Sequence, residues 1–266
     1  MTSVILSARS LTKTFGGQRA TVLGAAVPRL TALDGVSIDI VRGTTLGVVG
    51  ESGSGKTTLG RLLLLLDRPS SGEVLFGGHN AATLDTKGRR EFRRRVQPVF
   101  QNPYSSLNPR MSVGAIVSEP LLWSGAADRD ERRTRVAEAL TSVGLSPDDA
   151  RRFPGEFSGG QRQRIAIARA IASQPDVIIL DEPVSSQDIS VRAQILNLLK
   201  DIQEQRGVAY VLITHDLSIL SFMCDEVAVL HQGKVVEFGA AAQVCSAPKH
   251  PYTSTLLSSV LSIDAA

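Results

Sequence analysis

The feature that most constrains the fold is the stretch Gly50–Thr58, which matches the phosphate-binding pattern G-x-x-x-x-G-K-[ST]. A short apolar run rich in β-branched residues, Thr44–Val49, precedes it, and a proline-free apolar run, Leu59–Leu66, follows it. Strand, glycine loop and helix in this order form the setting in which the pattern binds phosphate. The alternative is a glycine turn that precedes Lys-Thr by chance, and the flanking strand and helix argue against it.

The chemistry of this loop follows from its backbone. Gly50, Gly53 and Gly55 allow positive φ and a close approach to a ligand. The N–H groups of the loop and of the helix start then point to one place, where the helix dipole favours an anion. Lys56 is placed for the β- and γ-phosphates of a nucleotide, and the Thr57 hydroxyl for Mg²⁺. The expected phosphate-binding residues are Gly50, Glu51, Ser52, Gly53, Ser54, Gly55, Lys56, Thr57 and Thr58.

Length and composition set limits on the rest. With 266 residues, 42% of them hydrophobic, the chain can form one large domain or a core with a small subdomain. Cys224 and Cys245 stand far apart without metal-ligand spacing, which is typical of reduced thiols in a cytosolic protein. Met1–Arg9 lacks the features of a signal peptide, and the longest apolar run, Leu62–Leu66, is too short to span a bilayer. If the protein acts at a membrane, other chains supply the span.

The net charge of +3 suits a nucleotide, nucleic acid or anionic headgroups without choosing among them. No basic patch is interleaved with the aromatic residues that stack on bases, so nucleic acid is not favoured. A charged stretch, Leu84–Arg95, ends in three consecutive arginines. We expect these arginines to form a solvated face, and contact with lipid headgroups or a partner is the alternative.

The N-terminal part predicts two strands, Val4–Leu11 and Ala32–Ile40, with a turn at Asp34-Gly35 and an irregular insert over 18–30 between them. Two early strands joined by a long connection favour an antiparallel β layer beside the main sheet. Phe15 ends the first of these regions, and it either stacks on a nucleotide base or belongs to the core.

The middle of the chain changes character after a short strand at Val96–Phe100. Tyr104–Pro120 is polar and turn-rich, and Asp128–Val143 has the pattern of a charged amphipathic helix. Residues from about 102 to 164 are therefore expected to form a helical insertion within an α/β core.

A second glycine motif, Ser158-Gly159-Gly160-Gln161, opens the predicted helix Arg162–Ala172. A Ser-Gly-Gly turn at a helix start exposes backbone N–H groups and a hydroxyl, which favours an anion there. A plain N-cap is the alternative.

Two buried strands carry polar groups at their carboxyl ends. Val177–Leu180 ends in Asp181 and Glu182, and carboxylates in this position of an open α/β sheet lie where ligands bind. We expect Asp181 to hold Mg²⁺ and Glu182 to polarise an attacking water. His215 follows the next buried strand. A lone histidine is usually structural, but its place at the same sheet edge favours a contact with the γ-phosphate.

Together these segments resemble the ATP-binding cassette (ABC) ATPases over nearly the whole chain. The sequence is similar to Walker A at Gly50–Thr57, to the ABC signature at Phe157–Gln161, to Walker B with the catalytic glutamate at Val177–Glu182, to the D-loop at Ser185–Asp188 and to the switch histidine at His215. Gln101 falls where the Q-loop glutamine of this family senses Mg²⁺ and faces the membrane partner.

The resemblance implies roles for single residues. Catalytic roles fall to Lys56, Gln101, Glu182 and His215, and Mg²⁺ ligation to Thr57, Gln101 and Asp181. ATP contacts fall to Phe15 on the adenine, Gly50–Thr58, Gln101, Ser158, Gly159, Gly160, Gln161 and Asp188. The D-loop departs from the family pattern, since Ser186 and Gln187 replace Ala and Leu. Because this loop crosses to the opposite ATP site in the family, the departure bears on the coupling between the two sites.

The implied fold is α/β: a P-loop NTPase (RecA-like) core with an N-terminal antiparallel β subdomain and an inserted α-helical subdomain. The core with the β subdomain is expected over 1–101 and 165–245. The helical subdomain, ending in the signature, covers 102–164, and a short tail covers 246–266.

A narrower resemblance rests on two segments. Phe100–Arg110 and His250–Thr253 are similar to the dipeptide, oligopeptide and nickel importer ATPases. This implies a peripheral ATPase on the cytoplasmic face of the inner membrane, powering uptake of peptides or small solutes such as nickel chelates. The implied partners are transmembrane permease subunits, a second ATPase subunit that is identical or homologous, and, indirectly, an extracytoplasmic solute-binding protein.

In this family two subunits pair head to tail, with ATP between the Walker A loop of one and the signature of the other. Two alternatives stay open. One is an ABC ATPase of a soluble metabolic complex of the phosphonate-breakdown type. The other is an ATP-driven protein acting on nucleic acid or ribosomes, a class that usually has two cassettes or long coiled insertions, which this sequence lacks.

Overall fold

The computed structural model describes residues 3–16, 29–124, 128–185 and 187–261. The chain forms two compact units. Unit one comprises residues 1–3, 41–45 and 84–212, and unit two comprises residues 4–40, 46–83 and 213–266.

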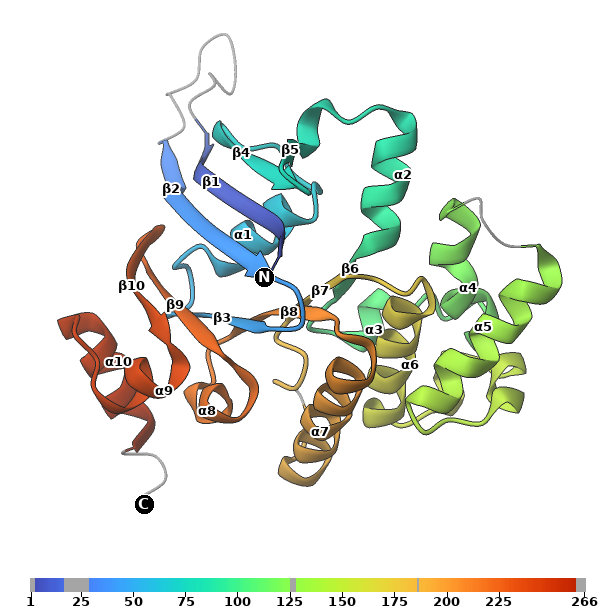
Figure 1. The fold of residues 1–266 in the computed structure, drawn as a ribbon. Helices are drawn as coiled ribbons and strands as arrows, with labels where there is room; N and C mark the ends of the chain where they lie inside the picture. Colours follow the sequence, from blue (N-terminus) through green and yellow to red (C-terminus); the bar gives the residue numbers. More distant parts are fainter. Residues whose placement is uncertain (1–2, 17–28, 125–127, 186, 262–266) are drawn as a thin grey trace, which may run out of the picture. The chain divides into compact units, whose positions relative to one another are not determined.

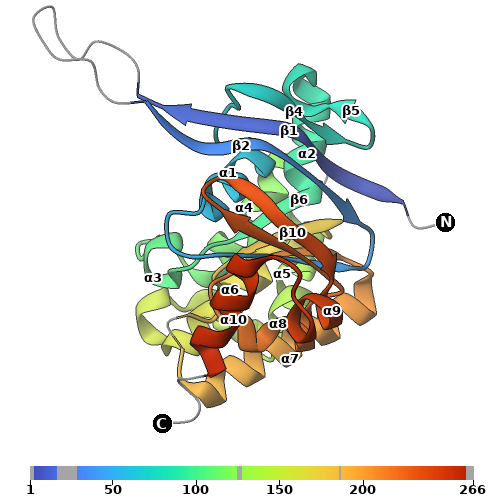
Figure 2. The same ribbon diagram turned by 90° about the vertical axis from the view of Figure 1, so that its left-hand side faces the viewer.

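Unit two contains a four-stranded sheet with the strand order β2-β1-β4-β5 (Figures 1 and 2). The strands are β1 (Val4–Phe15), β2 (Leu30–Val41), β4 (Ser71–Phe76) and β5 (His79–Asn80). β1 and β4 pair antiparallel, as do β4 and β5 through the glycine turn at 77–78. The antiparallel β layer predicted from the sequence is therefore confirmed.

The turn predicted at Asp34-Gly35 is wrong, because β2 continues through both residues. Gly35 takes a left-handed φ of 69° inside the strand, which a residue without Cβ does at little cost. The Asp34 N–H donates to the Gly233 carbonyl at 2.9 Å, so the strand keeps a backbone partner at this kink.

The rest of unit two holds the phosphate-loop region and the C-terminal elements. These are β3 (Thr45–Val49), α1 (Lys56–Leu63), α8 (Leu220–Met223), β9 (Glu226–His231), β10 (Lys234–Ala240), α9 (Ala241–Ser246), α10 (Pro251–Leu261) and two 3₁₀ turns at Ala81–Thr83 and Leu217–Ile219. β3 and β9 run parallel, and β9 and β10 form the hairpin that the sequence predicts.

The C-terminal elements share one apolar cluster built on Val49, Val227 and Val229. Side chains of α10, among them Tyr252 and Leu256, pack against this cluster. The segment expected to be only a short tail therefore contains a helix that is part of the core of unit two. Cys224 and Cys245 pack there too, as thiols and not as a disulfide, and burial raises the pKa of the Cys245 thiol.

Unit one carries the strands β6 (Val96–Val99), β7 (Val177–Asp181) and β8 (Ala209–Thr214), in the order β8-β7-β6. β6 and β7 are parallel, with Val96 opposite Val177 and Val99 opposite Leu180. Nearly every residue of these strands is buried, as expected for parallel strands covered on both faces.

Helices make up most of the remainder of unit one. They are α2 (Thr86–Arg95), α3 (Pro103–Ser106), α4 (Val113–Ser124), α5 (Arg129–Ser142), α6 (Gly159–Ala172) and α7 (Ile189–Arg206), with 3₁₀ turns at Pro147–Arg151 and Pro154–Glu156. α4, α5 and α6 pack together (Figure 1). The described elements from 103 to 156 are all helical, while the predicted domain division stays a prediction. Among the described residues, no helix combines the length and apolar character needed to cross a bilayer.

The expectation of a turn-rich segment over Tyr104–Pro120 is wrong for its second half. α4 begins at Val113 and runs through Pro120. Val113, Ile116, Val117 and Leu121 are all buried, and this spacing places them on one helix face. Burial of that apolar face outweighs the helix-breaking tendency of the proline.

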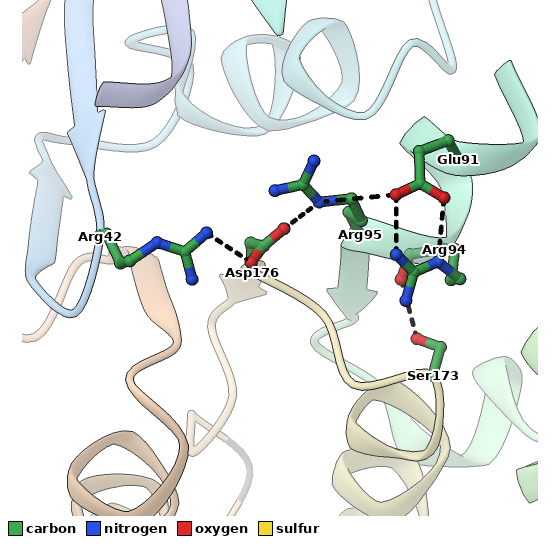
Figure 3. Close-up of polar contacts among 6 residues, drawn as sticks. All are labelled: Arg42, Glu91, Arg94, Arg95, Ser173 and Asp176. Atoms are coloured by element: carbon green, nitrogen blue, oxygen red, sulfur yellow. Dashed lines mark hydrogen bonds and ion pairs between the residues drawn. The ribbon is translucent and has the colours of Figure 1, made fainter. Parts of the chain in front are cut away.

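The arginine run at the end of α2 is only partly a solvated face. Arg93 is exposed, but Arg94 pairs with Glu91 at 2.7 Å, and Arg95 pairs with both Glu91 and Asp176 (Figure 3). Asp176, which directly precedes β7, also pairs with Arg42 at 2.8 Å (Figure 3). Its N–H donates to the Arg95 carbonyl at 2.9 Å, so this carboxylate and its peptide tie β7 to the end of α2.

Candidate functional site

The phosphate-loop region begins α1 without any side-chain cap. The N-cap residue, Gly55, has a left-handed φ of 109° and supplies no side-chain cap to the helix. Lys56 is buried, and its ammonium donates to the carbonyls of Gly50 at 2.7 Å and Glu51 at 2.8 Å. Backbone N–H groups and a lysine therefore meet at one helix start, which is the arrangement that binds phosphate.

Two glycines of this loop are required by close backbone contacts. A Cβ on Gly50 would lie 2.2 Å from the Leu230 carbonyl oxygen, and one on Gly55 would lie 2.4 Å from the Ala32 carbonyl oxygen. The β9–β10 hairpin supports the loop directly, since the Gly233 N–H donates to the Ser54 carbonyl at 3.0 Å. These two glycines are therefore needed both for their left-handed backbone and for the close approach of neighbouring carbonyls.

The second glycine motif begins α6 with a complete cap. Ser158 Oγ accepts from the Gln161 N–H at 3.3 Å, and Gln161 Oε1 accepts from the Ser158 N–H at 2.9 Å. A Cβ on Gly160 would lie 2.6 Å from Val191 Cγ1, so a larger residue at this position would force the Val191 side chain to shift. The N-cap role is confirmed, while the contact with an anion stays a prediction.

The glutamine and the glutamate singled out from the sequence meet in unit one. Gln101 Nε2 donates to Glu182 Oε2 at 2.6 Å. Glu182 directly follows β7 with a left-handed φ of 48°, and Ser185 Oγ donates to its carbonyl at 3.2 Å. A non-glycine residue held in this conformation is strained, and such strain concentrates at functional sites.

A hollow of about 590 Å³ in unit one brings several predicted residues together. It is lined by Gln101, Asn102, Tyr104, Ser158, Gly159, Gly160, Ser185, Gln187, Asp188 and Val191. The signature turn, the Q-loop and the D-loop therefore share one surface. The Gln187 amide lies beside Gly159, at 3.6 Å from where a Cβ would stand, so the D-loop departure faces the signature. Ser186 lies outside the described residues.

The other predicted residues are distributed over both units. Asp181 is the half-buried last residue of β7 in unit one. In unit two, His215 is exposed directly after β8, and Thr57 is exposed in the first turn of α1. Phe15 is 43% exposed, with Lys13 Nζ at 5.1 Å from its ring centre, so it is not a core residue. Its stacking on a base stays a prediction.

Sequence reasoning missed several contacts around these motifs. The Arg162 guanidinium stacks on the Tyr104 ring at 4.1 Å, and Arg169 donates to the Ser106 carbonyl at 2.7 Å, so α6 holds the segment that follows Gln101. In unit two, Tyr252 contacts Glu51 across 201 positions of sequence. No local pattern predicts such distant pairs.

The fold and the phosphate loop define a P-loop nucleotide-binding protein. Within that class, the chain belongs to the ABC transporter family, because the family described as "ABC transporter" matches residues 33–185. A second family, "Oligopeptide/dipeptide transporter, C-terminal region", matches residues 236–266. The protein is an ABC-type ATPase and binds ATP.

Curated relatives are similar over most of the chain. The dipeptide transport ATP-binding protein DppF of Haemophilus influenzae is 50% identical over 236 residues, covering 89% of this chain and 72% of the relative. A putative peptide import ATP-binding protein of Brucella ovis is 46% identical over 260 residues, covering 98% and 80% respectively.

A solved structure supports the same fold. The ATP-binding cassette MJ0796, in a dimeric post-hydrolysis state bound to ADP and Pi, aligns with a TM-score of 0.76 and 31% identity. The alignment covers 89% of this chain and 99% of that cassette. The α/β cassette fold with its antiparallel subdomain is therefore confirmed.

Proposed function

We propose that this chain is the ATP-hydrolysing subunit of an ABC importer for dipeptides, oligopeptides or related small solutes such as nickel chelates. The observation that carries the proposal is the pair of family matches, a cassette over 33–185 followed by the peptide-transporter C-terminal region over 236–266. The relatives named for dipeptide transport and peptide import support the solute class. No observation favours a soluble metabolic complex.

The proposed nucleotide site uses the two helix starts and the residues around them. Phe15 stacks on adenine, the loop Gly50–Thr58 binds the phosphates, and Lys56 moves its ammonium from two carbonyls to the β- and γ-phosphates. The signature turn Ser158–Gln161 and Asp188 act on nucleotide held by a second subunit. His215 contacts the γ-phosphate.

Mg²⁺ fits the proposed donor set. Thr57, Gln101 and Asp181 offer a hydroxyl, an amide oxygen and a carboxylate, which are the hard oxygen ligands this ion prefers. No cluster of three or more His, Cys, Asp or Glu side chains occurs among the described residues, so the nucleotide would supply the remaining ligands. When bound, the ion neutralises charge on the phosphates.

Glu182 is the proposed base that polarises the attacking water. Its carboxylate already accepts from Gln101 at 2.6 Å, so Gln101 orients it and senses changes at the phosphates. The strained backbone after β7 holds this carboxylate at the carboxyl end of the strand.

The surface around the signature calls for a second cassette. The hollow of about 590 Å³ exposes the start of α6, and Ile189, next to Asp188, is 85% exposed. The start of α6 and the D-loop residue Asp188 are thus open on one surface, where a second cassette could reach them. We take that partner to be an identical or homologous ATPase subunit, in line with the dimeric state of the similar cassette MJ0796.

A second hollow of unit one, about 310 Å³, is the proposed permease contact. It is lined by Arg90, Arg93, Arg94, Gln97, Pro98, Phe100, Glu119, Pro120 and Arg169. Arg94 is paired with Glu91, but Arg90, Arg93 and Arg169 against Glu119 still leave a positive surface, which favours an acidic segment of a transmembrane permease subunit.

Arg169 links this pocket to the Gln101 loop. Burial lowers the pKa of the Arg169 guanidinium and the charge of Glu119 opposes that shift, so the group gains from a further anion nearby. Its donation to the Ser106 carbonyl holds the segment after Gln101. A permease segment in this pocket would therefore act on the Q-loop through Arg169.

The subunit would lie on the cytoplasmic face of the inner membrane and meet the solute-binding protein only through the permease.

The decisive test of the ATPase assignment is Glu182→Gln. We expect turnover to fall by a factor of about 10² to 10⁴, while ATP still binds, because only the water-polarising carboxylate is lost. Glu204→Gln on the exposed face of α7 is the matched control and should keep full turnover. Unchanged ATP hydrolysis in Glu182→Gln would reject the assigned base.

The permease contact is tested by reversing charge at the exposed pocket arginines. Arg90→Glu with Arg93→Glu should reduce co-purification with permease subunits from detergent-solubilised membranes and leave ATP binding intact. Arg133→Glu on α5, which is exposed and outside the pocket, is the control. Equal recovery of the permease with both proteins would place the contact elsewhere.

A further inference from the structure

We propose that Tyr252 is a positioning residue for the phosphate loop. Its hydroxyl holds the backbone N–H of Glu51, so the C-terminal segment contributes to nucleotide affinity. The inference rests on the proposed role of Gly50–Thr58 in binding the phosphates. It goes beyond that role because it assigns a task to a residue from the C-terminal region.

Glu51 is held at both of its peptide groups. The Tyr252 hydroxyl accepts from the Glu51 N–H at 3.0 Å, and the Lys56 ammonium donates to the Glu51 carbonyl at 2.8 Å. Both contacts lie within unit two. The first residue of the loop after Gly50 is therefore fixed from one side by the helix that follows it, and from the other by α10.

The Tyr252 ring is itself firmly placed. It packs on the His231 ring with 3.9 Å between ring centres and 34° between planes, and His231 is the last residue of β9. The Tyr252 N–H donates to His250 Nδ1 at 3.2 Å, which fixes the first turn of α10. The hydroxyl thus sits at the end of a side chain with little freedom to move.

Glu237 of β10 anchors the chain just before Tyr252. Its carboxylate accepts from the N–H groups of Lys249 at 2.8 Å and His250 at 3.0 Å. Burial raises the pKa of Glu237, but these hydrogen bonds outweigh that effect and lower it overall. The carboxylate therefore stays ionised near neutral pH and keeps Lys249 and His250 against the hairpin that also supports the loop.

Nucleotide binding changes which of the two Glu51 contacts persists. To reach the phosphates, Lys56 must withdraw its ammonium from the Gly50 and Glu51 carbonyls. The Tyr252 contact is then the side-chain restraint that stays on this peptide. A loop already ordered before binding loses less conformational entropy, so the hydroxyl should favour affinity without changing the chemical step.

The test is Tyr252→Phe in the full chain, which removes one oxygen and keeps the ring on His231. We expect Kd for ATP and KM to rise by about twofold to tenfold, the effect of one lost hydrogen bond, with kcat and the melting temperature unchanged. Thr255→Val is the matched control, because it removes a hydroxyl of the same helix that donates to the Pro251 carbonyl within that helix. Thr255→Val should alter neither Kd for ATP nor KM.

Two outcomes would overturn the inference. One is an unchanged Kd and KM in Tyr252→Phe. The other is a lowered melting temperature with kcat and KM affected alike, which would mean that the hydroxyl only stabilises the fold. Lys56→Ala, measured in parallel, separates this inference from the proposed function. If Lys56→Ala leaves ATP affinity intact, the proposed nucleotide site is wrong. If Lys56→Ala weakens ATP binding and Tyr252→Phe does not, only the positioning role of Tyr252 is wrong.

Discussion

The N-termini of α1 and α6 both carry glycine motifs, yet they differ in how they are capped. α1 begins at Gly55, which offers no side chain to its N–H groups. α6 begins at Ser158, whose side chain and that of Gln161 satisfy each other's backbone. Gly55 gives the start of α1 no side-chain cap and Lys56 adds a positive charge there, so α1 is suited to completion by an anionic ligand, whereas α6 already has a complete side-chain cap.

This difference suggests a division of labour between the two ends. The phosphate loop should bind nucleotide in a single subunit, where it gains both the helix dipole and the Lys56 charge. The signature end should add little in a single subunit and act only when a second cassette brings nucleotide to it. The following variants test that contrast, beginning with the largest expected effect.

Gly55→Ala should be the most damaging of these changes. The added Cβ would meet the Ala32 carbonyl oxygen at 2.4 Å, and φ of 109° is unfavourable for alanine. Strain and overpacking together should lower the free energy of unfolding by about 3 kcal/mol. Urea unfolding of the purified chain measures this, and a loss below about 1 kcal/mol would show that the loop can shift away from β2.

Lys56→Ala should weaken ATP binding by roughly tenfold to hundredfold, because hydrogen bonds to charged groups contribute about 1.5–3 kcal/mol. Titration calorimetry with ATP on the isolated subunit measures it. Lys87→Ala, an exposed lysine of α2, serves as the control. If affinity in Lys56→Ala were retained, the idea that α1 is completed by nucleotide would not stand.

Gly160→Ala should destabilise less than Gly55→Ala. The added Cβ would lie 2.6 Å from Val191 Cγ1, a side chain that has more freedom than a backbone carbonyl, so we expect a loss of about 1–2 kcal/mol. ATP binding to the isolated subunit should be unchanged and turnover of the assembled transporter reduced. A drop in single-subunit ATP affinity would contradict the proposed division of labour.

Ser158→Ala should give the smallest change in stability. Loss of an N-cap serine costs about 1 kcal/mol, which thermal unfolding can resolve. Nucleotide affinity of the isolated subunit should again stay the same. An effect on affinity as large as that of Lys56→Ala would mean that the α6 start acts within its own subunit.

The sequence predicted those features that depend on short stretches. The strand before Gly50 and the parallel strand Val177–Leu180 were predicted, and the cap at Ser158 was named as the alternative to an anion contact, because local spacing determines all three. α4 was missed because the stretch Tyr104–Pro120 was taken as polar and turn-rich, although the spacing of Val113, Ile116 and Val117 is that of a helix face.

Contacts between distant segments could not be derived in the same way. The pairing of Asp176 with Arg42 and Arg95, and that of Tyr252 with Glu51, joins residues 81 to 201 positions apart. A charge or a hydroxyl in the sequence gives no sign of its partner when the fold alone brings them together. The family resemblance gave Gln101 and Glu182 catalytic roles, but the hydrogen bond between them was not predicted.

The left-handed backbone at Glu182 sets the stability of the folded chain against its rate of ATP hydrolysis. Most side chains resist φ near 48°, whereas glycine accepts it readily. A Glu182→Gly subunit should therefore tolerate at least as much denaturant as the parent and yet hydrolyse almost no ATP. The Glu182 side chain therefore lowers the free energy of unfolding at this position, and its contribution is to ATP hydrolysis.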